Sequence, residues 1–78
     1  MQAKVFVTLK NGVHDPQGET VSHTLKSMGY DEVGDIRIGK YIEVELKGAD
    51  GEAAKARLTE MCEKLLANTV IESYRIEL

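Results

Sequence analysis

The sequence predicts an α+β fold in which an antiparallel sheet carries two helices on one face. Three segments alternate between apolar and polar residues, as strands with one buried face do. Two other segments repeat apolar residues every three to four positions, as amphipathic helices do. The segments follow one another as β-α-β(-β)-α-β. Packing both helices on one face of the sheet is the simplest way to bury these patterns.

The first strand and the first helix are marked by residues at their ends. The strand covers residues 4–10, and its apolar face consists of Val5, Val7 and Leu9. Asp15 and Pro16 predict the start of a helix, because aspartate accepts hydrogen bonds from free backbone N–H groups and proline tolerates the first helical position. We expect this helix to run to Met28 and to end at Gly29. Its apolar stripe consists of Val21, Leu25 and Met28.

The central segment, residues 33–47, returns to the alternation that is typical of strands. Gly39-Lys40 lies in its middle. This pair could form the tight turn of a hairpin or a bulge in one long bent strand. We favour the turn.

A second helix and a last strand complete the chain. Asp50 is a suitable cap for the helix, and Asn68 is expected to close it. The apolar stripe of the helix consists of Ala54, Leu58, Met61 and Leu65. Tyr74, Ile76 and Leu78 then share one face of a C-terminal strand. The sheet face away from the helices would carry a mixture too apolar for full exposure, which predicts an interface formed by Phe6, Thr8, Tyr41, Glu43 and Ile71.

The length and composition indicate one small domain, residues 1–78, that needs a partner. A chain of 78 residues buries only about 60 to 65% of its unfolded surface. The single cysteine, Cys62, cannot form an internal disulfide, which favours a reducing, cytoplasmic setting. The net charge of −3 argues against nucleic acid as a partner. No apolar run approaches the roughly 20 residues that span a bilayer, so we expect no membrane association.

No residue pattern points to catalysis, a cofactor or a metal in this chain. Residues 34–40 match the letters of a phosphate-binding loop, but they lie within strand-like alternation, and Tyr41 stands where a magnesium-binding Ser or Thr should follow. Two histidines and one distant cysteine do not supply the clustered ligands of a zinc site. The first strand-to-helix loop also lacks the arginine that a phosphate-hydrolysing enzyme of this architecture would use.

Three blocks of the sequence together resemble the PurS family. Residues 9–18 read LKNGVHDPQG and are similar to the family's LKxGVxDPQG opening. Residues 37–43 read RIGKYIE and resemble its RxGKxxE segment, and residues 61–74 read MCEKLLANTVIESY and resemble its CxKLLANPVIExY segment. The chain departs from the family pattern at His14, where an apolar residue is common, and at Thr69, where proline is common.

The resemblance implies a ferredoxin-like subunit of phosphoribosylformylglycinamidine (FGAM) synthase, a ligase of de novo purine biosynthesis. In that enzyme a glutaminase (PurQ) and a synthetase (PurL) use glutamine, ATP and Mg to convert FGAR to FGAM. The small subunit contributes no catalytic residue. It forms a dimer or a dimer of dimers and bridges its partners for ammonia transfer. The candidate residues for assembly contacts are Arg37, Lys40, Tyr41, Asn68 and Tyr74, whereas the structural positions that set turns and caps are Gly12, Asp15, Pro16, Gly18 and Gly39.

A ferredoxin-like regulatory module is the alternative hypothesis. In such a module the dimer interface would bind an amino acid or a nucleotide. The two hypotheses differ in what changes the protein's state: a regulatory module responds to its small ligand, whereas an assembly subunit responds to protein partners. A free-standing enzyme, the third possibility, would show turnover by the isolated chain.

Overall fold

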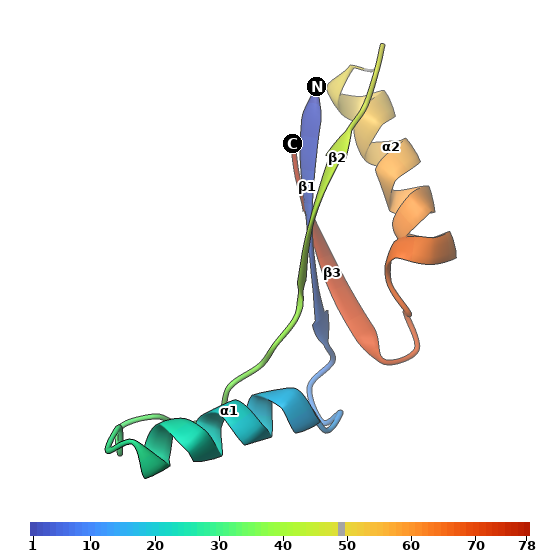
Figure 1. Ribbon diagram of the computed structural model, residues 1–78. Coiled ribbons are helices and arrows are strands. Elements are labelled where there is room, and N and C mark those ends of the chain that lie inside the picture. The colour runs from blue at the N-terminus through green and yellow to red at the C-terminus, as the bar shows by residue number, and fades with distance from the viewer. Residues whose placement is uncertain (49) are drawn as a thin grey trace.

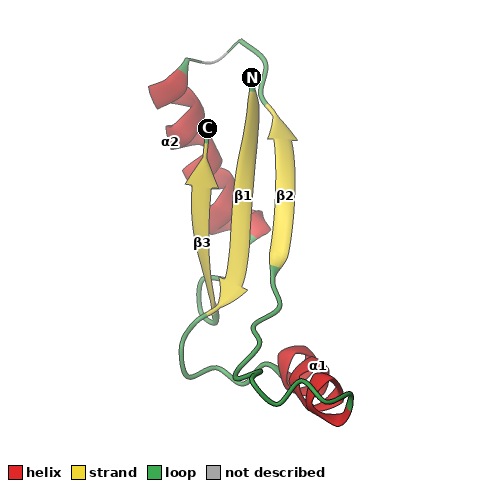
Figure 2. Cartoon of the chain, turned by 90° about the vertical axis from the view of Figure 1, so that its left-hand side faces the viewer, coloured by secondary structure: helices red, strands yellow, loops and turns green. Residues whose placement is uncertain are grey.

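The chain folds as a three-stranded antiparallel sheet with two helices, which confirms the predicted α+β class (Figures 1 and 2). The computed structural model describes residues 1–48 and 50–78. The strand order is β2-β1-β3, so the N-terminal strand is central. The elements are β1 (Gln2–Leu9), α1 (Pro16–Ser27), β2 (Lys40–Glu45), α2 (Gly51–Met61), a π-helical turn η1 (Cys62–Leu66) and β3 (Glu72–Glu77).

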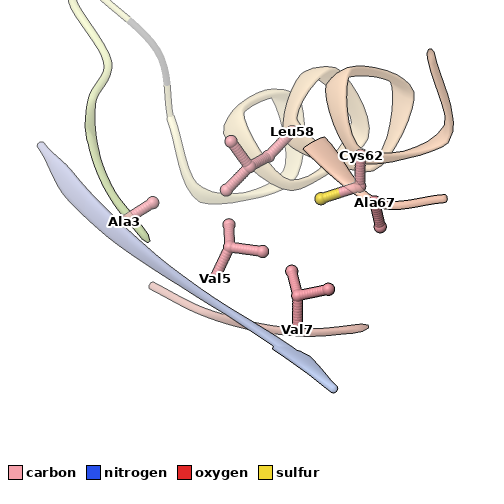
Figure 3. Packing of buried hydrophobic residues seen from close by; sticks show 6 residues of the cluster. All are labelled: Ala3, Val5, Val7, Leu58, Cys62 and Ala67. Carbon is pink, nitrogen blue, oxygen red and sulfur yellow. The ribbon is translucent and has the colours of Figure 1, made fainter. Parts of the chain in front are cut away.

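The core lies between the central strand and the second helix. Alternation along β1 places every second side chain on the inner face, where Ala3, Val5 and Val7 are buried. Leu58 of α2 and Cys62 of η1 point toward these three residues (Figure 3). Ala54 and Ala67 are the other buried apolar residues of the described chain, so the core is small.

The first helix lies elsewhere than expected. We predicted two helices on one face of the sheet, whereas α2 covers the sheet and α1 projects beyond the end of β1 (Figures 1 and 2). The small residues Gly18 and Ser22 are the buried residues of α1. They pack against the connector, residues 34–39. Ser22 donates a 2.8 Å hydrogen bond to the Gly34 carbonyl, and a Cβ on Gly18 would overlap the Ile36 carbonyl oxygen.

The predicted hairpin turn at Gly39-Lys40 is wrong. Residues 34–39 form an irregular connector, and regular strand structure begins at Lys40, opposite Val7 of β1. The connector does not join the sheet because side chains of α1 and its cap form hydrogen bonds with the backbone of the connector. The side chains of Ser22 and Asp15 bond to the Gly34 carbonyl and the Ile38 N–H.

The second helix begins as predicted and ends differently. Asp50 caps it, because the Asp50 carboxylate accepts a 2.8 Å hydrogen bond from the Ala53 N–H. After Met61 the helix widens into η1. This π-helical turn ends with a 3.1 Å hydrogen bond from the Ala67 N–H to the Cys62 carbonyl. This wider turn shifts the side-chain register. Leu65, expected on the apolar stripe, is therefore 83% exposed.

No helix in the described part of the chain is long and apolar enough to span a membrane.

Candidate functional site

Asp15 joins the first helix to the connector. One carboxylate oxygen accepts a 2.8 Å hydrogen bond from the Gly18 N–H, which is the helix cap that the sequence predicts. The other oxygen accepts a 2.8 Å hydrogen bond from the Ile38 N–H, 23 residues away in sequence. The Asp15 side chain is only 8% exposed. One buried carboxylate thus fixes both segments.

Arg37 adds the end of β1 to the same junction. Its guanidinium donates hydrogen bonds of 2.7 and 3.0 Å to the carbonyl oxygens of Leu9 and Lys10. Its Nε lies 3.9 Å from the Asp15 carboxylate. We call Asp15 and Arg37, with the backbone groups that they bind, the joint. It ties β1, α1 and the connector together.

The joint stabilises the ionised form of Asp15. The Gly18 and Ile38 N–H groups hold the pKa of its carboxyl below the usual value, and the charges of Arg37 and His14 lower it further against the opposing effect of burial. Asp15 is therefore an anion at neutral pH. It acts as a fixed acceptor for backbone donors rather than as a proton carrier.

An open groove of about 950 Å³ runs beside the joint, between α1 and the connector. Its ionisable lining residues are His14, Asp15, Glu19, His23, Lys26, Asp35 and Arg37. His14 and Glu19 are paired across 3.2 Å, and Arg37 is engaged in the joint. Positive and negative side chains are mixed along the groove, so its electrostatic field does not favour a ligand of one charge.

Glu72 brings two predicted site residues together. Its carboxylate accepts a 2.6 Å hydrogen bond from the Asn68 N–H and lies 3.9 Å from the Lys40 ammonium. The Glu72 side chain is 15% exposed, because it shares the inner strand phase with Tyr74 and Ile76. We did not single out Glu72 from the sequence, although its spacing from Tyr74 and Ile76 indicates that it lies on the inner face of the strand.

Tyr74 links the last strand to the π-helical turn. Its hydroxyl donates a 2.7 Å hydrogen bond to the Glu63 carboxylate. This bond, together with burial, raises the pKa of Tyr74 to about 12. In the same turn, burial raises the pKa of the Cys62 thiol, and the Glu63 charge adds to the effect. The thiol is therefore protonated at neutral pH, which makes it a packing group rather than a nucleophile.

The outer face of the sheet carries an aromatic and cationic row. Tyr41, Phe6 and Arg75 lie side by side across the three strands in the observed register. The Tyr41 and Phe6 rings are 5.2 Å apart, and the Arg75 guanidinium lies 4.5 Å from the Phe6 ring centre. Tyr41 is 52% exposed. We call this set the outer row.

The structure thus places the five predicted site residues in four settings. Arg37 is in the joint, Lys40 and Asn68 meet at Glu72, Tyr74 binds Glu63, and Tyr41 is in the outer row. Tyr41 is the one with a broad exposed ring. Among the described residues there is no group of three or more His, Cys, Asp or Glu side chains placed to hold a metal ion.

Comparison with known proteins identifies relatives over nearly the whole chain. The model of the PurS family, phosphoribosylformylglycinamidine (FGAM) synthase, matches residues 2–78. The PurS subunit of this synthase from Bacillus subtilis is 55% identical over 76 residues, which cover 97% of this chain and 89% of the relative. The Synechocystis subunit is 48% identical over 75 residues, which cover 96% of this chain and 75% of the relative.

Solved structures have the same fold. Bacillus subtilis PurS superposes with a TM-score of 0.87 at 55% identity, covering 97% of this chain and 94% of that chain. Methanocaldococcus jannaschii PurS, one of the subunits of formylglycinamide ribonucleotide amidotransferase in the purine biosynthetic pathway, gives 0.88 at 37% identity and coverages of 97% and 92%. A chain of PurLQS from Thermotoga maritima gives 0.89 at 32% identity and coverages of 97% and 93%.

Proposed function

Because the chain belongs to the PurS family of FGAM synthase, we propose that it is the small, non-catalytic subunit of this ATP-dependent ligase in de novo purine biosynthesis. The observation that carries the proposal is the family match over residues 2–78. At 55% identity to the Bacillus subtilis subunit, the chain retains all three sequence blocks that the family resemblance rests on.

In the proposed role the chain bridges a PurQ glutaminase and a PurL synthetase, so that ammonia from glutamine reaches the synthetase without escaping to water. ATP, Mg and glutamine are used by those partners. The likeness to a chain of Thermotoga maritima PurLQS supports this arrangement. We place the protein in the cytoplasm as a single domain, residues 1–78, that self-associates as a dimer or dimer of dimers.

The contacts of the reactive side chains also favour a scaffold. Asp15 and Arg37 bind backbone groups, Tyr74 binds Glu63, and the Cys62 thiol is buried. Each of these groups stabilises the chain's own elements. The outer row leaves aromatic and arginine side chains at the sheet surface, a composition that is enriched at protein interfaces.

Reconstitution of the synthase tests the proposal. FGAM formation is measured with purified PurQ and PurL, with and without this chain, using glutamine or ammonium chloride as the nitrogen source. We expect the glutamine-dependent reaction to require the chain, while the ammonia-dependent reaction of the synthetase proceeds without it. The three proteins should also co-elute in the presence of glutamine and an ATP analogue.

Two outcomes would overturn this role. If the chain changes neither the glutamine-dependent rate nor the elution of its partners, it is not the bridging subunit. If its stability or oligomeric state instead changes with an amino acid or a nucleotide alone, the regulatory module becomes the better interpretation.

A further inference from the structure

The chain exposes more surface than a compact protein of its size. Its radius of gyration is 15.9 Å, whereas a compact domain of this length has about 11 to 12 Å. Its accessible surface of 5691 Å² exceeds the roughly 4,700 Å² expected for its mass by about 1,000 Å². A standard interface buries about 800 Å² on each partner. The excess is therefore the amount that one specific interface would cover.

Part of this excess is the apolar stripe of α1. Val21 is 38% and Met28 65% exposed, with Leu25 half-buried between them. The residues with which α1 packs on its own chain are Gly18 and Ser22, on another side of the helix. The helix thus has an apolar face without a surface to cover it.

The second uncovered surface is the inner face of β2. α2 lies behind β1 and β3 in Figure 2, and no helix of this chain stands behind β2. The inner side chains of β2 and the residue that follows it are only half-buried, although they border the core. They are Ile42, Val44 and Leu46. We call this surface the β2 slot. It is the place that a second helix occupies when two helices cover one sheet face.

The chain's own α1 does not fill this slot. Asp15 and Arg37 hold the start of α1 at the far end of β1, and Ser22 fastens its middle to Gly34. To reach the slot, α1 would have to break all of these contacts. A helix from another molecule can enter without that loss.

We propose that two copies of the chain exchange their first helices, so that α1 of each protomer covers the β2 slot of the other. The exchange is reciprocal and closes with twofold symmetry, because the same two surfaces are used on both copies. It joins an apolar stripe to an apolar slot and removes surface of the amount that is in excess. It specifies the self-association included in the proposed function and in that respect rests on it.

A pair of α1 variants tests the exchange through the mass of the isolated chain. Val21→Glu places a charge in the stripe, and His23→Glu places one on the opposite side of the same helix. Sedimentation equilibrium should find the unmodified chain dimeric. Val21→Glu should weaken the dimer roughly tenfold or more, as loss of a buried anchor does. His23→Glu should leave the dissociation constant within about twofold.

A spin label identifies the surface that α1 reaches. A chain labelled with a nitroxide at Ser27→Cys is mixed with an isotope-labelled, unmodified chain. Ser27 faces away from the stripe, and Cys62 is fully buried and so protected from the reagent. We expect paramagnetic broadening at Ile42, Val44 and Leu46 of the isotope-labelled chain. Unmodified chain treated with the same reagent should cause none.

The results separate this proposal from the proposed function. A monomeric isolated chain, or a dimer whose α1 label broadens residues outside the β2 slot, overturns the exchange. The second result would stand even if Val21→Glu failed to fold, because the labelled chain keeps Val21. Neither result changes the subunit role, which is decided by the glutamine-dependent reaction of the reconstituted synthase.

Discussion

At the scale of single residues, Asp15 matters most to the geometry of the candidate site. Its two oxygens bind backbone donors from α1 and from the connector, and Arg37 extends this junction to β1. A carboxylate in this setting is stabilised as an anion. The arrangement therefore makes the position of α1 depend on the charge of one side chain.

The first residue-scale prediction concerns Asp15→Asn. The folded-state pKa of Asp15 is below its ordinary value of 3.8, so its stabilising contribution is present above about pH 4 and is lost as the pH falls through the folded pKa. Asn keeps one acceptor for Gly18 but cannot accept from Ile38 with its amide nitrogen. We expect the variant to be less stable at pH 7 and the difference to shrink toward pH 2.

Urea unfolding at a series of pH values measures this effect. Asp35→Asn is the matched control, because Asp35 is an exposed carboxylate in the connector. Its unfolding midpoint should follow that of the unmodified chain at every pH. A constant difference between Asp15→Asn and the unmodified chain across the whole pH range would contradict the role of the ionised carboxylate.

The sequence allowed only the local half of this junction to be predicted. Asp15 was recognised as a cap because a cap depends on residues three positions apart. Its bond to Ile38 joins residues 23 positions apart and has no local signal. The contact between Glu72 and Lys40 has no local signal either, since Lys40 approaches Glu72 from another strand. The roles of the five candidate residues as contacts to other subunits stay predictions; they are Arg37, Lys40, Tyr41, Asn68 and Tyr74.

At the scale of elements, alternation in the sequence was a good guide to strands only where a neighbouring strand was available. β1, β2 and β3 all follow the predicted faces. Residues 34–39 alternate in the same way, yet they form the connector, because Asp15, Ser22 and Gly18 engage its backbone. The helices were found from their caps. The π-helical turn was not, because it preserves the composition of a helix while changing its register.

The second prediction is that the connector does not tolerate a side chain at Gly39. A Cβ there would overlap the Val7 carbonyl oxygen and press on the Thr8 side chain, so β2 would have to move away from β1. We expect Gly39→Ala to lower the free energy of unfolding by about 1 to 3 kcal/mol, as overpacking does.

Gly34→Ala is the control for that experiment. It lies in the same connector, and a Cβ at this position would meet no atom within 4 Å. Chemical denaturation of both variants gives the comparison, and Gly34→Ala should stay within about 0.5 kcal/mol of the unmodified chain. Equal losses in the two variants would mean that the connector requires glycine for backbone freedom rather than for the close approach to Val7.

At the scale of the whole molecule, the chain is elongated, with one layer formed by the sheet and a second formed by α2. Its extents are 50 × 24 × 14 Å, and α1 lies beyond one end of the sheet (Figure 1). The inner face of the sheet is covered by α2 (Figure 1). The outer face lies on the other side of the sheet from α2 (Figure 1), and the outer row lies in its middle.

The last prediction therefore concerns Arg75, which lies over Phe6 in the outer row. Arg75 and Arg57 are matched surface arginines: their side chains are 67% and 70% exposed, and each pairs with a nearby glutamate. Arg57 lies on α2, away from the outer face. If the outer row docks onto the synthetase or the glutaminase, Arg75→Ala should weaken co-assembly roughly tenfold, whereas Arg57→Ala should change it by less than about twofold.

The measurement is titration of each variant into the reconstituted synthase, followed by its glutamine-dependent rate. Both variants should keep the mass of the unmodified chain in sedimentation, because both residues are exposed on the surface. A loss of activity that appears with Arg75→Ala and is overcome at high concentration of the variant would assign the outer row to subunit contact. Equal titration curves for the two variants would mean that the partners dock elsewhere, and the row would then serve only to hold the three strands in register.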